Sequence, residues 1–309
     1  MKKTKLYLLS GFLGAGKTTF LNNILEVLSD KRVGVIMNEF GKIGIDGQVI
    51  QKEDIEMVEI NRGSIFCSCL KMSFVEAMTA MADQDLEYLF VESSGLADPS
   101  NIGDVLYGLE VTKGDVYDYK GAICLVDGLH FLDQIDDIET VERQLKHCHL
   151  IVISKADLID EETIGKISEK IREINPKADI QVASFGKLDR KILEEDLIEG
   201  HILESEDTTN TPENKPKTLN LTFDKDVKKE DLTRFINSIS KDSYRIKGFF
   251  KLEDGWNQVD VVNQKIDYKL IDETRDKSQL VIISKIGPQI IRGIANNWKD
   301  IIGEEMKLR

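Results

Sequence analysis

Cysteine and long apolar runs are both scarce in this chain of 309 residues. The four cysteines are too few for a secreted disulfide scaffold, so a reducing cytoplasm is the expected compartment. No apolar run approaches the length that crosses a bilayer, and the run after Lys5 is cut by Ser10 and Gly11 before it could serve as a signal peptide. The sequence therefore predicts a cytoplasmic protein without a membrane-spanning segment.

Positive charge is in deficit as well. The chain has 41 lysines and arginines against 55 aspartates and glutamates, which gives a formal net charge of -14. A surface of this sign repels nucleic-acid backbones and anionic lipid headgroups, so neither is expected as a partner. The charge balance does not argue against a nucleotide that binds in a local pocket.

Apolar runs and amphipathic segments alternate over the first 183 residues, a pattern typical of βαβ units and a mostly parallel sheet. Strands are expected at residues 5–9, 33–38, 55–60, 88–92, 121–127, 150–154 and 179–183. Helices are expected at residues 17–28, 73–82, 140–146 and 161–174.

The stretch ESEDTTNTPENKPK at 204–217 contains no apolar residue and two of the five prolines, which is typical of a linker. The predicted domains are therefore 1–203 and 218–309. The second part is rich in strand patterns, which predicts a small α+β domain with an antiparallel sheet. Its strands are expected at 218–223, 245–252, 256–262, 265–270 and 280–284, and its helices at 229–240 and 288–297.

The segment GFLGAGKTT at 11–19 lies between a predicted strand and a predicted helix and matches the P-loop pattern G-x-x-x-x-G-K-[ST]. Such a loop points backbone N–H groups at phosphate oxygens, while its lysine reaches the terminal phosphates and the next hydroxyl ligates Mg²⁺. The predicted nucleotide-binding residues here are Gly11, Gly14, Ala15, Gly16, Lys17, Thr18 and Thr19.

Two later stretches indicate which base and which reaction this P-loop serves. Glu92 ends an apolar strand and precedes Gly95, where a P-loop fold places an acid near Mg²⁺ and an N–H near the terminal phosphate. A capped turn after a strand also explains this stretch when it is taken alone, but that explanation is weak beside the P-loop. Lys17, Glu92 and Gly95 are the predicted catalytic residues.

The second stretch is SKAD, which contains Ser154, Lys155 and Asp157 and follows another apolar strand. Asp157 can accept hydrogen bonds from N1–H and N2–H₂ of guanine, an edge for which adenine has no matching donors, while the Lys155 stem packs on the base. By itself, SKAD is a capped helix start about as often as a base site.

Five motifs in this order resemble those of the CobW-type GTPases, a family of cytoplasmic P-loop metallochaperones. They are GFLGAGKTT at 11–19, NEFG at 38–41, ESSGLADP at 92–99, SKADL at 154–158 and YRIKGFF at 244–250. The resemblance implies an α/β P-loop NTPase domain of the SIMIBI type, with a mostly parallel sheet flanked by helices, and a CobW-like C-terminal α+β domain.

The resemblance also implies slow GTP hydrolysis coupled to delivery of a transition metal, zinc or cobalt, to a client metalloprotein or a cofactor-pathway enzyme, including one related to cobalamin. GTP or GDP and Mg²⁺ are the implied cofactors, and a nucleotide-dependent homodimer is an implied assembly. By family position, Asn38, Glu39 and Asp46 join Thr18 and Glu92 as switch or Mg²⁺-side residues.

The stretch NRGSIFCSC at 61–69 departs from the family's Cys-x-Cys-Cys motif, because only Cys67 keeps a cysteine position and Cys69 adds a thiol two residues later. Two thiolates suit a soft or borderline metal, yet a stable zinc site needs four ligands. A buried pair of small thiols is the alternative. His147, Cys148 and His149 likewise fit either a metal pair or a helix-to-strand junction.

Two other functions stay open. A GTP-dependent regulator or assembly factor without metal transfer is favoured by the altered cysteine motif. A P-loop kinase for a small molecule explains 11–19 but leaves SKAD and ESSG unexplained.

Overall fold

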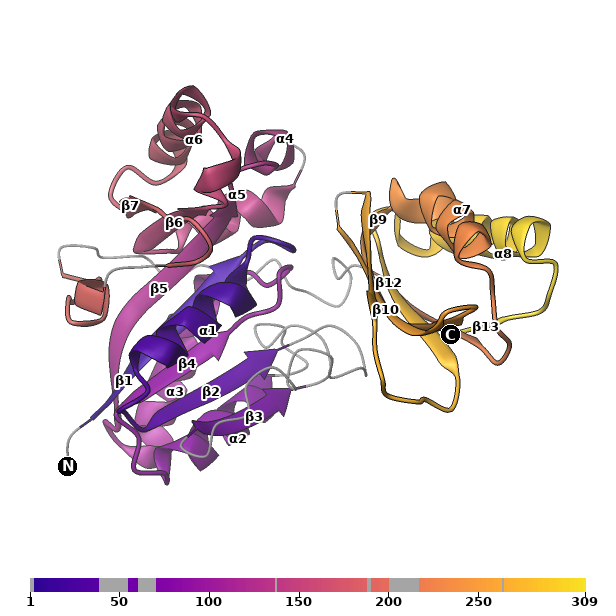
Figure 1. Cartoon of the computed structure of the whole chain (residues 1–309). Helices are drawn as coiled ribbons and strands as arrows, with labels where there is room; N and C mark the ends of the chain where they lie inside the picture. Colours follow the sequence, from indigo (N-terminus) through magenta and orange to yellow (C-terminus); the bar gives the residue numbers. More distant parts are fainter. Residues whose placement is uncertain are drawn as a thin grey trace. The chain divides into compact units, whose positions relative to one another are not determined.

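The computed structural model describes residues 3–38, 55–60, 71–136, 138–187, 190–199, 217–262 and 264–309. The chain forms two compact units, Met1–Asn214 and Lys215–Arg309, each with its own sheet and hydrophobic core (Figure 1). Most of 204–217 lies outside the described residues, so the linker and the domain bounds at 203 and 218 stay predictions. Within the described ranges, no helix combines the length and apolarity needed to cross a bilayer.

The sheet of the first unit has seven strands in the order β3-β2-β4-β1-β5-β6-β7, and every pairing between them is parallel. The strands are β1 (Thr4–Gly11), β2 (Val33–Asn38), β3 (Ile55–Ile60), β4 (Tyr88–Glu92), β5 (Tyr117–Asp127), β6 (Leu150–Ser154) and β7 (Asp179–Val182). Strands β2, β4 and β6 are buried along their whole length, as expected for a sheet covered on both faces. The predicted α/β class with a parallel sheet is confirmed.

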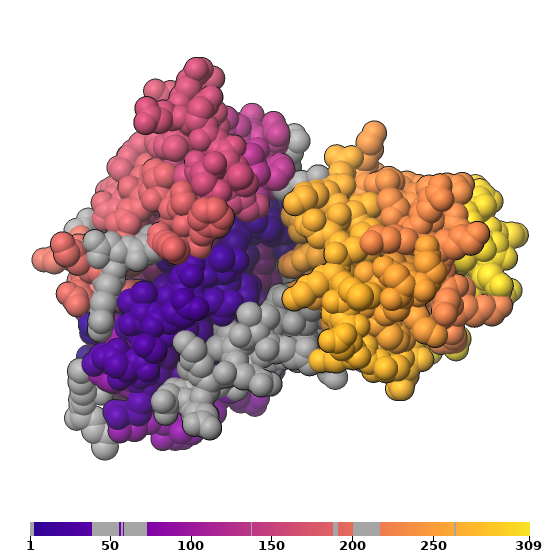
Figure 2. Space-filling model, in the orientation of Figure 1, coloured from indigo at the N-terminus to yellow at the C-terminus, as the bar shows by residue number. Residues whose placement is uncertain are grey.

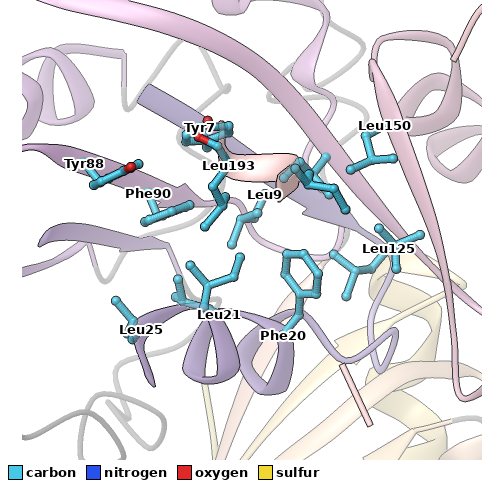
Figure 3. Close-up of a cluster of buried hydrophobic side chains, with 14 of the residues drawn as sticks. Tyr7, Leu9, Phe20, Leu21, Leu25, Tyr88, Phe90, Leu125, Leu150 and Leu193 are labelled. Atoms are coloured by element: carbon cyan, nitrogen blue, oxygen red, sulfur yellow. Dashed lines mark hydrogen bonds between the residues drawn. The ribbon is translucent and has the colours of Figure 1, made fainter. Parts of the chain in front are cut away.

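The helices of the first unit are α1 (Lys17–Val27), α2 (Lys71–Ala82), α3 (Ile102–Lys113), α4 (Phe131–Ile135), α5 (Glu139–Lys146) and α6 (Glu161–Ile174). Helix α1 lies across the sheet and buries Phe20 and Leu21 against Leu9 and Phe90 (Figure 3). The buried Tyr7 hydroxyl donates a hydrogen bond to the carbonyl oxygen of Leu193 at 2.9 Å. This packing fixes the position of the helix that follows the P-loop.

The second unit contains a six-stranded antiparallel sheet in the order β11-β10-β9-β12-β8-β13. Its elements are β8 (Thr218–Phe223), α7 (Lys229–Ser240), β9 (Ser243–Leu252), β10 (Gly255–Val262), β11 (Lys265–Leu270), β12 (Ser278–Ser284), α8 (Ile290–Ile301) and β13 (Lys307–Leu308). Helices α7 and α8 cover one face of the sheet and form part of this unit's outer surface (Figures 1 and 2). Trp298 meets Phe223 and Phe235 edge to face at 5.1 and 4.9 Å. The predicted α+β domain is thus present.

Truncation of Phe20 tests the packing of α1. We expect Phe20→Ala to lower the free energy of unfolding by about 3–5 kcal/mol, because its fully buried ring would leave a cavity under the helix. Val27 in the same helix is 38% exposed, so Val27→Ala should change the free energy of unfolding by under about 0.5 kcal/mol. Urea unfolding followed by circular dichroism measures both, and similar losses for the two variants would contradict this packing.

Candidate nucleotide-binding site

The predicted nucleotide residues gather at one edge of the parallel sheet. The P-loop follows β1, the Glu92 stretch ends β4, and the SKAD stretch begins at the end of β6. Parallel strands bring their carboxyl ends to the same edge, and ligands of open α/β sheets bind beyond that edge. The topology therefore brings together three segments that are far apart in the sequence.

Two glycines of the P-loop explain why this residue type is needed there. Gly11 has φ 130°, and a Cβ at this position would lie 2.4 Å from the carbonyl oxygen of Leu125. Gly16, with φ 89°, caps the start of α1, and a Cβ there would meet no atom within 4 Å. Gly14 also has positive φ, and Ala15 is fully buried. The backbone thus curls in front of α1 and borders open space, which fits a bound phosphate group.

Lys17 is the first residue of α1 and is only 8% exposed. Its ammonium donates hydrogen bonds to the carbonyl oxygens of Gly11 at 2.6 Å and Phe12 at 3.1 Å. The cation therefore lies over the loop whose N–H groups would face the phosphates. Thr19, two residues after Lys17 in the same helix, is exposed.

Thr18 contacts the predicted acidic residue directly. Its hydroxyl donates a hydrogen bond to Glu92 Oε1 at 3.0 Å, although the two residues are 74 positions apart. A hydroxyl and a carboxylate are the hard oxygen donors that Mg²⁺ prefers, so this donor pair fits that ion. Asn38, 2% exposed, ends β2 on the far side of β4.

Gly95 lies against the P-loop itself. A Cβ at Gly95 would come within 2.7 Å of the backbone nitrogen of Leu13 and within 2.8 Å of its side-chain Cγ. Only glycine allows so close an approach. The segment after β4 and the loop after β1 therefore touch each other at the predicted phosphate site.

At the predicted base site, Lys155 adopts φ 57°, an uncommon left-handed conformation for a residue with a side chain. Its ammonium donates to Asp127 Oδ2 at 2.8 Å, and His130 Nδ1 donates to the same oxygen at 3.0 Å. Asp127 is 1% exposed and holds the lysine in place. Asp157 is exposed and accessible to a ligand. Asp127 is not among the residues predicted from the sequence, although an acidic residue at the end of an apolar strand is a signal that could have indicated it.

Ser154, another predicted nucleotide-binding residue, makes its hydrogen bonds to backbone carbonyl groups. It is buried, and its hydroxyl lies 2.8 Å from the carbonyl oxygen of Ala15 and 3.0 Å from that of Val126. Because a hydroxyl carries one proton, it can donate to only one of these carbonyls at a time. Ser154 thus ties the end of β6 to the P-loop, 139 residues away.

Four predicted residues, Glu39, Asp46, Cys67 and Cys69, lie outside the described residues. The described ranges contain no group of three or more histidine, cysteine or acidic side chains that could hold a metal ion. Cys148 is buried, and burial together with a hydrogen bond to Cys124 raises the pKa of its thiol. Residues 147–149 lie between the end of α5 at Lys146 and the start of β6 at Leu150, and His149 Nδ1 accepts the Ala122 N–H at 3.0 Å, which favours the junction interpretation.

Substitution of Gly95 tests its contact with the P-loop. We expect Gly95→Ala to lower the free energy of unfolding by about 1–3 kcal/mol and to weaken nucleotide binding, because the added methyl group pushes on the Leu13 backbone. In Gly108→Ala the new methyl group meets no atom within 4 Å, so this helical control should be as stable as the parent or slightly more stable. Calorimetry of unfolding and of the binding of a non-hydrolysable GTP analogue checks both variants. Normal nucleotide affinity in Gly95→Ala would contradict the assigned contact.

Known proteins are similar to this chain in sequence and in fold. Residues 5–182 match the family described as CobW/HypB/UreG, nucleotide-binding domain, and residues 217–293 match the Cobalamin synthesis protein cobW C-terminal domain. The zinc chaperone YjiA of Escherichia coli is 30% identical over 198 residues, which cover 62% of this chain and 61% of that protein. The zinc-regulated GTPase metalloprotein activator 1 of Schizosaccharomyces pombe is 31% identical over 193 residues, which cover 59% of this chain and 46% of that protein. The match thus spans less than two thirds of either relative.

A solved structure of a Zn(II)-bound triple mutant of the YjiA GTPase has a TM-score of 0.50 and 22% identity, and the alignment covers 97% of this chain and 99% of that one. At this identity the likeness supports the fold alone. The match over residues 5–182 covers more than half of the chain, and by it the chain belongs to the CobW/HypB/UreG family.

Proposed function

We propose that this protein is a GTPase that couples its nucleotide state to the binding and delivery of a transition metal. The cargo is zinc or cobalt, and the recipient is a client metalloprotein or a cofactor-pathway enzyme in the cytoplasm. Support comes from the family match and from the names of the two relatives, a zinc chaperone and a zinc-regulated GTPase metalloprotein activator. A homodimer that forms with bound nucleotide belongs to the same proposal.

The observation that carries the proposal is the gathering of a phosphate loop, an oxygen donor pair and a base-side acid at one sheet edge. Lys17 and the P-loop N–H groups would hold the phosphates, and Gly95 would lie next to the terminal one. Thr18 and Glu92 would hold Mg²⁺, which when bound offsets charge on the phosphate oxygens. Asp157 would read guanine while Asp127 keeps Lys155 beside the base.

The metal part of the proposal rests on Cys67 and Cys69. Both lie in the chain between the NEFG segment and Glu92, so a change at the terminal phosphate has a short covalent route to the thiols. If the GTP and GDP forms hold the thiols differently, linkage requires that metal and nucleotide change each other's affinity by the same factor. A GTP-dependent regulator without metal transfer is the competing function.

Base recognition is tested by Asp157→Asn. An amide cannot accept both guanine protons, but its N–H can pair with the 2-carbonyl of xanthine, so we expect GTP affinity to fall about tenfold or more and xanthosine triphosphate to bind better. Asp160→Asn is the matched control, since Asp160 caps α6 and asparagine caps equally well. Competition binding measures the discrimination between GTP and xanthosine triphosphate. If it is unchanged in Asp157→Asn, Asp157 does not read the base.

Coupling is tested by the affinity for a non-hydrolysable GTP analogue with and without Zn²⁺ or Co²⁺. We expect metal to change this affinity by about 5-fold or more in the parent and to have no effect in a Cys67→Ser, Cys69→Ser variant. Ser68→Ala, which keeps both thiols, should behave like the parent. If metal leaves the parent's nucleotide affinity unchanged, the metallochaperone proposal fails and the regulator takes its place.

A further inference from the structure

The segment that follows β4 is closed off from solvent. Every residue from Ser93 to Asn101 is buried, although the segment has no regular structure before the short 3₁₀ helix Pro99–Asn101. A buried irregular segment needs partners for its backbone polar groups. One is internal, because the Ala97 N–H donates to the carbonyl oxygen of Ser94 at 2.9 Å and closes a turn around Gly95.

Other partners come from helix α5, about 45 residues further along the chain. Gln144 is 1% exposed, and its amide nitrogen donates to the carbonyl oxygens of Ala97 at 2.9 Å and Gly95 at 3.3 Å. One side chain thus holds both ends of the Gly95–Ala97 stretch. Gly95, which accepts one of these hydrogen bonds, is also the residue whose Cα lies against the P-loop.

The neighbouring residue fixes the far end of the segment. Arg143 Nε donates to Asp98 Oδ2 at 2.7 Å, and its NH2 group donates to the Ser100 hydroxyl at 3.1 Å. Asp98 is fully buried, and its other oxygen accepts the Ser100 N–H at 3.1 Å. Charge-assisted bonds of this kind are strong and directional when they are shielded from water.

Helix α5 is itself anchored at its C-terminus. The Asn175 amide donates to the carbonyl oxygens of Leu145 at 2.8 Å and Cys148 at 2.9 Å, and the Asn175 side chain is buried. The helix therefore cannot shift along its axis without breaking buried hydrogen bonds. This anchor gives the segment after β4 a fixed support.

We infer that Arg143 and Gln144 are positioning residues for the terminal phosphate: they hold the Gly95 segment against Leu13 so that its backbone faces a bound GTP. The inference rests on the proposed GTPase function and assigns part of it to two side chains of helix α5, which lies outside the nucleotide-binding motifs of the sequence. We call these contacts of Arg143 and Gln144 with residues 95–100 the clamp. GDP lacks the terminal phosphate, so its binding does not depend on the clamp. The two nucleotides should therefore respond differently when the clamp is weakened.

The experiment uses the full-length chain with Gln144→Met and Arg143→Lys. Methionine keeps the length of glutamine and suits a helix but removes both donors, and it also removes a buried Oε1 that has no partner among the described residues. Lysine keeps a charge beside Asp98 but lacks the planar fork with which Arg143 reaches Asp98 from Nε and Ser100 from a second nitrogen. Glu142→Gln, on the exposed side of the same helix, is the matched control.

Four quantities are measured: affinity for GDP, affinity for a non-hydrolysable GTP analogue, kcat for phosphate release, and hydrogen exchange of amides 93–97. In Gln144→Met we expect GDP affinity within twofold of the parent, the analogue-to-GDP affinity ratio about fivefold lower, kcat about tenfold lower, and faster exchange. Arg143→Lys should lie between this variant and the parent, and Glu142→Gln should match the parent.

Two results would overturn the inference while the parent remains an active GTPase. One is an equal loss of affinity for GDP and the analogue, which indicates a purely structural role. The other is an unchanged ratio and kcat in Gln144→Met. A parent that binds no GTP, or releases no phosphate from it, instead refutes the proposed function and the inference with it.

Discussion

Strand β1 is paired on both sides by parallel neighbours, β4 and β5, and this pairing determines where the chemistry of the first unit can occur. Parallel pairing sends the carboxyl ends of these strands to one edge, so the loops that leave them must share the same space. The sheet then limits how those loops can be built. Gly11 cannot carry a side chain because β5 is too close, and Gly95 cannot carry one because the P-loop is too close. The steric demands of the sheet edge and the needs of a phosphate site coincide.

Polar side chains do the remaining work at this edge, and most of them are buried. Glu92, Asp127 and Asp98 each bind a donor from another segment, namely Thr18, Lys155 and Arg143. Burial of a carboxylate costs free energy unless the group is paired. Removal of one partner therefore leaves a buried polar group without its hydrogen bond and destabilises the fold. The site is thus a set of mutually dependent pairs, each of which links two elements of the sheet edge.

Much of the fold could be predicted because its signals are local. Buried strands of a parallel sheet form short apolar runs, and β2, β3 and β4 lie at the predicted residues. Helix α3 was missed because Tyr107 and Val111 are exposed, 70% and 69%, and blur its apolar period. Strand β5 begins at Tyr117, four residues before the predicted start at 121. Its first four residues are only half buried, so they do not form part of the apolar run from which the strand was predicted.

In the site, the P-loop is a local motif and could be recognised, whereas its supports are not local. Ser154 is a predicted nucleotide-binding residue, and its hydroxyl bonds to the carbonyl oxygen of Ala15, a contact across 139 residues that no spacing rule reveals. Asp127 and Gln144 act on segments 28 and up to 49 residues away. Their roles depend on which strands are neighbours, and that order emerges only from the assembled sheet.

The two tryptophans of the chain, Trp256 and Trp298, both belong to the second unit, and the first unit has none. Trp298 is enclosed by Phe223 and Phe235, and Trp256 is 8% exposed. Each unit has its own core, so the chain need not unfold in a single step. Intrinsic tryptophan fluorescence therefore originates in the antiparallel domain alone, so unfolding of the nucleotide-binding domain has to be followed by a second signal.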